Sequence, residues 1–185
     1  MGGGASAAHN DEFVSVNDTF GKALPLLNMP AKRRYLKRDE TFLLSELLLA
    51  CQQGHIDEIE ILLNEGHDIN EIDKYGRTPL ILACEKGSID VAIFLIDKKA
   101  NINIREKRYG KTALISATMQ GNEKVLSALL NGGADIDLVD KFGKSALYRA
   151  IELHHTSIVS TLLAACANTD SQTDVGRTAL LEVNK

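Results

Sequence analysis

Few side chains in this sequence are spaced for chemistry. The five histidines are His9, His55, His67, His154 and His155. His154 and His155 are adjacent and point apart at a helical turn, and no carboxylate or thiol is spaced to complete a metal site with them. The three cysteines are odd in number and lack CxxC spacing, which suggests neither a zinc site nor a disulfide framework. We therefore expect no catalytic residues, no bound metal and no cofactor.

The N-terminus carries the pattern that predicts a covalent modification. Met1-Gly2 followed by Ser6 matches the N-myristoylation pattern, in which removal of methionine exposes the glycine. A single acyl chain needs a second signal for stable anchoring, and a basic run supplies one. Its cations are Lys32, Arg33, Arg34, Lys37 and Arg38. Three other interpretations stay open: an unmodified glycine-rich start, the solvated face of a capping helix, and a nuclear-localisation signal.

Composition limits the function classes. The chain has 185 residues, of which 44% are hydrophobic, so it can bury one sizeable core. Residues 41–185 hold fifteen basic and twenty acidic side chains, which argues against general nucleic-acid binding. The longest apolar stretch falls short of the ~20 residues that cross a bilayer, and no secretory signal is present. We expect a cytoplasmic protein, with peripheral membrane association as a variant and a nuclear location as the alternative.

An internal repeat predicts the elements that position any binding residues. Five segments align at spacings of 33, 34, 33 and 33 residues. They start near Ser45, Thr78, Thr112, Ser145 and Thr178. In each unit a leucine lies two residues after the start, and in the first four units a small residue lies three positions later. A second apolar pattern with helical spacing follows, so each complete unit is predicted to contain two short helices, the first capped by its Ser or Thr.

A turn follows each second helix. Glycine at the helix end supplies a left-handed cap, and Lys99 and Cys166 stand at two such positions where glycine is missing. A second tight turn, centred on another glycine, then leads into the next unit. These central glycines are Gly76, Gly110, Gly143 and Gly176. The segment around Gly110 has one extra residue, between Asn103 and Thr112, which predicts a longer and more basic tip.

The unit resembles the ankyrin repeat. Asp73-Lys-Tyr-Gly-Arg-Thr-Pro-Leu80 and Asn131-Gly-Gly-Ala-Asp-Ile-Asp137 match that family in order and spacing, and the likeness extends over roughly residues 41–185. The resemblance implies an all-α solenoid of stacked helix-turn-helix units with projecting β-turn fingers. It also implies a non-catalytic scaffold or adaptor that binds proteins. The histidine that follows Thr-Pro-Leu in the family pattern is absent here, so the hydrogen bonds that it makes between repeats are not expected.

Two regions are predicted along the chain. Residues 1–40 share none of the repeat pattern and are predicted to be a flexible segment that carries the lipidation motif and the basic run. Residues 41–185 form the ankyrin-repeat domain, whose last unit is incomplete and leaves an apolar edge. That edge consists of Leu180, Leu181 and Val183. It is open to three interpretations: a frayed end, an association surface, or a chain shorter than its natural parent.

The fingers predict a binding surface. In this architecture the turn tips of successive repeats line up on one concave face. Three tips repeat the order cation, aromatic, glycine, cation, which suits an acidic partner segment with apolar anchors. The predicted partner-binding residues are Lys74, Tyr75, Arg77, Arg108, Tyr109, Lys111, Lys141, Phe142 and Lys144. The alternative is that these cations only keep the turns soluble.

Two function classes follow from this pattern. The first is an interaction adaptor held at an anionic membrane by its N-terminus. The second is a structural or regulatory subunit of a larger assembly, for example a cytoskeletal or signalling one, without membrane anchoring. The two differ in whether Gly2 carries myristate.

Overall fold

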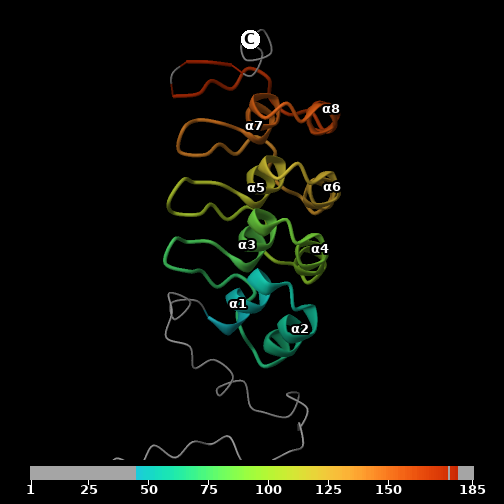
Figure 1. Ribbon diagram of the computed structural model, residues 1–185. Coiled ribbons are helices and arrows are strands. Elements are labelled where there is room, and N and C mark those ends of the chain that lie inside the picture. The colour runs from blue at the N-terminus through green and yellow to red at the C-terminus, as the bar shows by residue number, and fades with distance from the viewer. Residues whose placement is uncertain (1–44, 175, 179–185) are drawn as a thin grey trace, which may run out of the picture. The chain divides into compact units, whose positions relative to one another are not determined.

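Short helices in pairs make up the described part of the chain. The computed structural model describes residues 45–174 and 176–178 (Figure 1). In chain order the helix pairs are α1 (Glu46–Gln53) with α2 (Ile56–Asn64), α3 (Pro79–Lys86) with α4 (Ile89–Asp97), α5 (Ala113–Met119) with α6 (Glu123–Asn131), and α7 (Ala146–Glu152) with α8 (Thr156–Ala164). The predicted all-α fold is confirmed.

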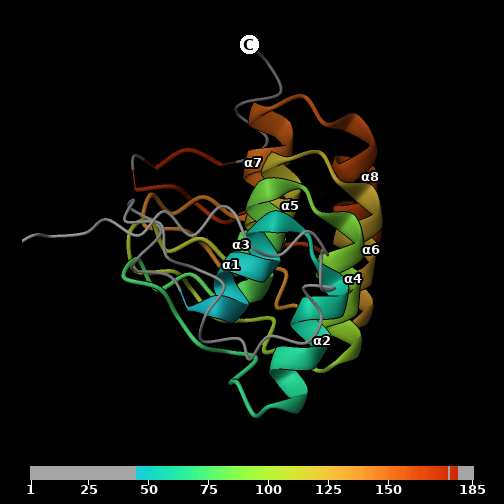
Figure 2. The same ribbon diagram turned by 60° about the horizontal axis from the view of Figure 1, so that its bottom comes forward.

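The helices stack in two parallel rows (Figures 1 and 2). Each of α1, α3, α5 and α7 packs on the next member of this first-helix row, and α2, α4, α6 and α8 do the same in a second-helix row. Within each repeat the two helices also pack on each other. The fingers, which are the turns that join successive repeats, project from the first-helix row on the side away from the second-helix row. This arrangement confirms the predicted solenoid of stacked helix-turn-helix units.

A hydroxyl side chain begins each helix of the first-helix row. Ser45, Thr78, Thr112 and Ser145 each accept a hydrogen bond from the backbone N–H three residues later, at 3.2–3.3 Å. Such caps satisfy a backbone donor that the helix leaves open and contribute about 1 kcal/mol each. Thr178 forms an isolated bridge with Gln172, and the helix predicted after it lies outside the described residues.

Residues with positive φ end the helices of the second-helix row. Gly66 and Gly133 have φ of 95° and 90°, and Lys99 and Cys166 take the same part with φ of 66° and 61°. The sequence placed these two side chains at glycine positions, and their φ values confirm that placement. A left-handed conformation costs a non-glycine residue about 1–2 kcal/mol.

Leucine and small residues fill the core. Leu47, Leu80, Leu114 and Leu147 are each 1% exposed or less. The predicted small residues behind them are equally buried: Ala50, Ala83, Ala117 and Ala150. Cys51 and Cys84 lie in the same layer and are also buried. The repeats therefore share one continuous hydrophobic core, in which each repeat covers the next.

Polar side chains add a second link between repeats. The side-chain oxygen of Asn70 accepts a hydrogen bond from the backbone N–H of Asn101 at 2.7 Å. One repeat later, Asn103 accepts from the N–H of Asp135 at 2.8 Å. These bonds connect the segments that follow successive second helices. They link neighbouring repeats in a sequence that lacks the family's inter-repeat histidine.

Ser116 in α5 is a buried polar residue whose hydroxyl is left unsatisfied among the described residues. It lies at the repeat position that Leu82 occupies in α3, is 2% exposed, and its hydroxyl has no hydrogen-bond partner among the described residues. Thr118 in the same helix, by contrast, donates to the carbonyl of Leu114 at 2.8 Å. A buried hydroxyl without a partner costs about 1–3 kcal/mol.

We therefore expect Ser116→Ala to raise the free energy of unfolding by about 1 kcal/mol, because it removes that desolvation cost and leaves only a small void. Urea denaturation followed by circular dichroism measures the change. Thr118→Ala is the matched variant, and its loss of a made hydrogen bond should lower stability. A lower stability for Ser116→Ala would contradict the prediction.

Within the part of the chain that the structure describes, no helix combines the length and the apolar character needed to cross a membrane.

Candidate functional site

Buried carboxylates close the fingers. The Asp73 carboxylate accepts hydrogen bonds from the backbone N–H groups of Tyr75 and Arg77, both at 2.8 Å. Asp140 accepts the equivalent bonds in its own finger at 2.9 and 3.0 Å. The two aspartates are 6% and 2% exposed. Each finger tip is therefore held rigidly from within, and its outward side chains start from a fixed backbone.

We number the fingers by their central glycines, Gly76, Gly110, Gly143 and Gly176. The second finger is closed by a glutamate in place of aspartate. Glu106 is 3% exposed and accepts from the backbone N–H groups of Arg108 and Tyr109 at 2.5 Å, and of Lys111 at 3.4 Å. The N–H of Glu106 bonds the carbonyl of Lys111, five residues on, whereas Asp73 bonds Arg77, four residues on. The extra residue of this finger lies within that loop, and the longer carboxylate spans it.

Neighbouring fingers are bonded backbone to backbone. The N–H of Lys107 donates to the carbonyl of Tyr75, and the N–H of Lys141 donates to the carbonyl of Tyr109, both at 2.7 Å. This pairing makes Lys107 the counterpart of Lys74 and Lys141. The sequence interpretation gave that place to Arg108, which is the added residue, and left Lys107 out of the site. Counting from the carboxylate that begins each finger, instead of from its glycine, finds Lys107.

The three predicted rings are linked in two ways. Tyr109 and Phe142 stack on each other, with ring centroids 6.5 Å apart and an interplanar angle of 28°. The guanidinium of Arg108 lies 4.8 Å from the Tyr109 centroid and 5.9 Å from the Tyr75 centroid, so it connects these two rings. The Lys74 ammonium lies 4.9 Å from the centroid of the Tyr75 ring. One chain of ring and cation contacts therefore runs from Lys74 through Tyr75, Arg108 and Tyr109 to Phe142. Each exposed cation–ring contact contributes about 0.5–1 kcal/mol.

The cations that follow the finger glycines are neutralised within the protein. Arg77 pairs with Asp73 at 2.7 Å and with Glu85 of α3 at 3.2 Å. Burial by itself lowers the pKa of Arg77, but its hydrogen bond to Asp73 and the two carboxylate charges outweigh that effect and raise it. Lys111 reaches the same Glu85 at 2.5 Å. Arg77 and Lys111, both predicted to bind the partner, therefore already form ion pairs with carboxylates of the protein itself.

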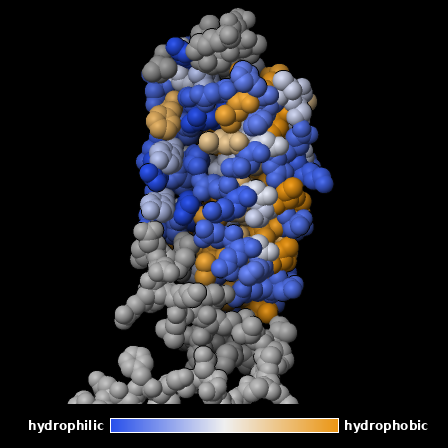
Figure 3. Space-filling model, viewed as in Figure 1, coloured by the Kyte–Doolittle hydropathy of each residue, from blue (hydrophilic) through white to orange (hydrophobic). Residues whose placement is uncertain are grey.

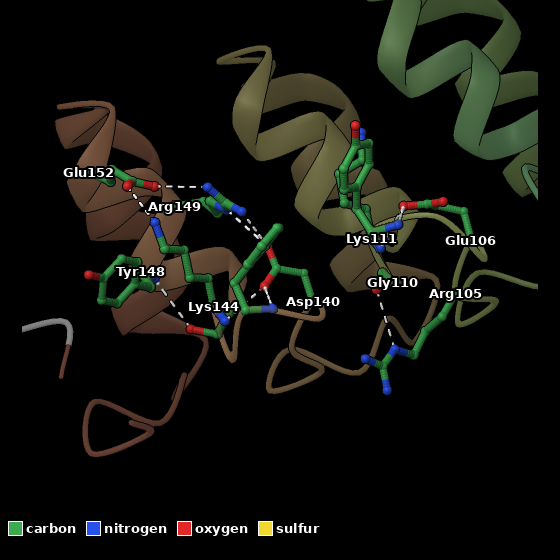
Figure 4. A network of polar contacts seen from close by, with 12 residues as sticks. Arg105, Glu106, Gly110, Lys111, Asp140, Lys144, Tyr148, Arg149 and Glu152 are labelled. Carbon is green, nitrogen blue, oxygen red and sulfur yellow. Dashed lines mark hydrogen bonds and ion pairs between the residues drawn. The ribbon is translucent and has the colours of Figure 1, made fainter. Parts of the chain in front are cut away.

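The third such cation is held in the same way. Lys144 pairs with Glu152 of α7 at 2.6 Å, and Glu152 also accepts from Arg149 at 3.0 Å. Arg149 in turn pairs with the buried Asp140. Figure 4 shows these side chains converging on the surface of α7. We call Arg77, Lys111 and Lys144 the inner row.

Five other cations of the first three fingers are exposed. One of them, Arg105, donates a hydrogen bond to the carbonyl of Gly110 at 3.3 Å. The other four are Lys74, Lys107, Arg108 and Lys141, which we call the outer row. None of them pairs with a carboxylate among the described residues. The fourth finger has Asp174 at the equivalent place, so the row changes sign there. A protein of net charge −4 thus presents a strip of unpaired positive charge on its fingers.

Comparison with known proteins decides the family. The family model described as Ankyrin repeats (3 copies) matches residues 47–140. The chain belongs to the ankyrin-repeat family. Ankyrin repeats generally act as protein–protein interaction modules and are typically non-catalytic, so the coarse part of the predicted function holds for this ankyrin-repeat chain.

Two curated ankyrin-repeat proteins are similar to this chain over part of their length. Ankyrin repeat and SAM domain-containing protein 6 of Rattus norvegicus is 31% identical over 108 residues, which is 58% of this chain and 12% of that protein. Ankyrin repeat and SOCS box protein 3 of Bos taurus is 42% identical over 118 residues, which is 64% of this chain and 22% of that protein. The chain spans less than a quarter of the length of either relative.

The residues best suited to chemistry lie apart in this ankyrin-repeat fold. His55 lies 3.4 Å from Glu58, and His154 ends α7 with a positive φ of 58°. No group of three or more potential metal ligands occurs among the described residues. Burial, with the nearby charge of Glu71, raises the pKa of Cys51 to about 12, which disfavours the thiolate form of this cysteine.

Some predicted residues lie outside the described part of the chain. The predicted lipidation site and membrane-contact residues are among them: Gly2, Lys32, Arg33, Arg34, Lys37 and Arg38. The predicted apolar edge at residues 180–183 is also outside it. These predictions are therefore carried by the sequence alone.

Glu152 makes the inner-row cluster on α7 sensitive to acid. Burial alone would raise its pKa, but the hydrogen bond from Lys144 and the charges of Lys144 and Arg149 outweigh burial and lower it below the usual 4.5. A depressed folded-state pKa adds stability above the unfolded value, and this stability is lost as the pH falls through the folded value.

We therefore expect Glu152→Gln to flatten the fall in melting temperature between about pH 5 and pH 3. Thermal melts at half-unit pH intervals measure it. The effect is modest, since the Glu152 side chain is 35% exposed. Lys144→Met removes the partner and should flatten the same curve. Parallel curves for wild type and both variants would contradict the expectation.

Proposed function

We propose that this chain is a non-catalytic adaptor that binds an acidic segment of a partner protein along its fingers. The observation that carries the proposal is the outer row, four exposed cations without carboxylate partners. Solvated turn cations need no particular arrangement, but these lie in register on fingers that are bonded to one another. Unpaired charge in register attracts a complementary chain and speeds its encounter.

The inner row has a different part in this proposal. Its cations are already paired with Glu85 and Glu152, so a partner carboxylate would have to displace a carboxylate of the protein itself. The inner row therefore supports the fingers, and the outer row meets the partner. Rings between the outer cations add apolar contact area, which suits a partner segment with both acidic and apolar residues.

Charge reversal of the outer row tests the proposal. Affinity purification from the native source compares the wild type with Lys74→Glu/Arg108→Glu/Lys141→Glu. We expect recovery of partners to fall at least tenfold, because three attractive contacts become repulsive. Lys98→Glu/Lys99→Glu/Lys124→Glu carries the same charge change at exposed residues away from the fingers, two just after α4 and one on α6, and should retain the partners. Unchanged recovery in the first variant would leave these cations as solvated turn residues.

For the N-terminal segment, we propose that myristate on Gly2 and the basic run after residue 31 tether the adaptor to an anionic membrane. The motif and the five cations support this, since together they meet the two-signal requirement for stable anchoring. Mass spectrometry of the protein from its native cell should find myristoylated Gly2. Unmodified Gly2 there would favour the alternative, a regulatory or structural subunit without membrane anchoring.

A further inference from the structure

We propose that a pocket beside Phe142 holds one large apolar side chain of the partner segment, next to the acidic residues that meet the outer row. The proposal rests on the proposed function and deepens it, because it names the second chemical element of the partner and where that element binds.

The pocket lies between the third and fourth fingers. It has a volume of about 360 Å³ and is lined by Phe142, Lys144, Arg149 and Asp174. The Phe142 side chain is 49% exposed, although it also stacks on Tyr109. A ring that is held by a neighbouring ring and still half open to solvent offers a fixed apolar surface to a partner.

The two cations of the pocket leave its wall apolar. The charged ends of Lys144 and Arg149 are held by Glu152 and Asp140 (Figure 4). Their aliphatic stems can therefore cover the pocket wall while their charges are satisfied elsewhere. A partner side chain that enters needs no charge of its own, so an apolar group fits better than a carboxylate.

The position of the pocket, on the finger face beside the outer row, suits one side chain of a longer bound segment. Sites for drug-sized ligands have volumes of about 300–1,000 Å³ and enclose most of the ligand. This pocket is at the low end of that range, and among the described residues four line it. The space-filling view shows a mainly hydrophilic face with smaller hydrophobic patches (Figure 3). One anchored side chain within a longer bound segment is the occupant that fits.

The change of sign along the outer row gives the bound segment a direction. Lys107, Arg108 and Lys141 lie on one side of the pocket, and Asp174 lines its other side. Acidic residues of the partner are attracted to the first side and repelled from the second. The segment therefore places its acidic residues over the second and third fingers, its large apolar residue beside Phe142, and no acidic residue beyond it.

Selection from a random library tests this arrangement without a known partner. Phage-displayed peptides of about twelve residues are selected on the immobilised full chain. The expected consensus has acidic residues and one large apolar residue at constant spacing, always in the same order. Enriched peptides are then synthesised, and their affinity for the full chain is measured by fluorescence anisotropy.

Matched variants distinguish loss of binding at the pocket from the general effect of removing an exposed apolar or charged side chain. Phe142→Ala should weaken the selected peptides at least tenfold, a loss of about 1.4 kcal/mol of binding free energy, because the buried apolar side chain of the peptide loses the ring against which it packs. Leu163→Ala removes an equally exposed apolar side chain, 46% exposed on α8, and should have no effect. Lys141→Glu should weaken binding more at low salt than at high salt, while Lys124→Glu should not.

Three outcomes would overturn the pocket: no enriched peptide, a consensus without a large apolar residue, or selected peptides that bind Phe142→Ala as tightly as the wild type. These outcomes are separable from failure of the proposed function. If charge reversal still abolishes recovery of native partners while Phe142→Ala is without effect, the fingers bind through charge and the pocket proposal is wrong. If charge reversal leaves recovery unchanged, the proposed function itself fails.

Discussion

Asp140→Ala is expected to lower the free energy of unfolding by about 3 kcal/mol. The Asp140 side chain is completely buried and accepts hydrogen bonds from the backbone N–H groups of Phe142 and Lys144, and it pairs with Arg149. Removing the carboxylate leaves two backbone donors of the finger without their acceptor, and it leaves the largely buried Arg149 guanidinium with the half-exposed Glu152 as its remaining ion-pair partner among the described residues. The lost backbone hydrogen bonds and the weaker compensation of the Arg149 charge account for the expected loss.

A second substitution separates these contributions. Asp140→Ala/Arg149→Met also removes the guanidinium that has lost its buried partner and should recover part of the lost stability, leaving mainly the cost of the two open backbone donors. Asp97→Ala, which changes an exposed carboxylate at the end of α4, is the control. Urea denaturation measures all four proteins. A loss below 1 kcal/mol for Asp140→Ala would show that the finger does not depend on its buried carboxylate.

Gly143→Ala is the second substitution with a large expected effect, a loss of about 3 kcal/mol. Gly143 has φ of +71°, which alone costs alanine about 1–2 kcal/mol. A Cβ there would also lie 2.8 Å from the backbone nitrogen of Asp174 and 2.9 Å from Cα of Thr173, both in the next finger. Because these are backbone atoms, the overlap can be relieved only by moving one finger away from the other.

The fourth finger supplies a matched control. Gly176 has φ of +72°, and no described atom lies within 4 Å of the position that its Cβ would take. Gly176→Ala should therefore cost only the conformational part, about 1–2 kcal/mol. The difference between the two variants measures how strongly neighbouring fingers are held together. Equal losses in thermal or urea denaturation would mean that the contact with the next finger carries no energy.

The repeat itself could be predicted because its signals are local. A capping hydroxyl, a leucine two residues later and a glycine at the helix end each act within a few residues, and the first four helices of the first-helix row begin where these signals place them. Lys99 and Cys166 could be placed in left-handed positions by the same argument. The repeated local signals are therefore sufficient to predict the stacked helix pairs, with no information about contacts between distant residues.

The division of the site into two rows could not be predicted in this way. Whether a finger cation is open or paired depends on what the first helix presents opposite to it. Glu85 and Glu152 hold inner-row cations, but the equivalent position in α5 is Met119, so Lys111 reaches back to Glu85 of the preceding repeat. An ion pair between two repeats depends on the distance between their side chains in the packed structure, and the spacing of residues in the sequence does not give that distance.

Glu106 shows how this protein can change one finger without changing its neighbours. One additional methylene group in the buried side chain accommodates one additional residue in the loop, and the backbone bonds to the fingers on both sides remain. The helices beneath still pack on their neighbours, and the insertion adds Arg108 to the surface. This insertion changes the tip of a single finger and leaves the stacked helices in place. A finger can therefore gain a new contact residue independently of its neighbours.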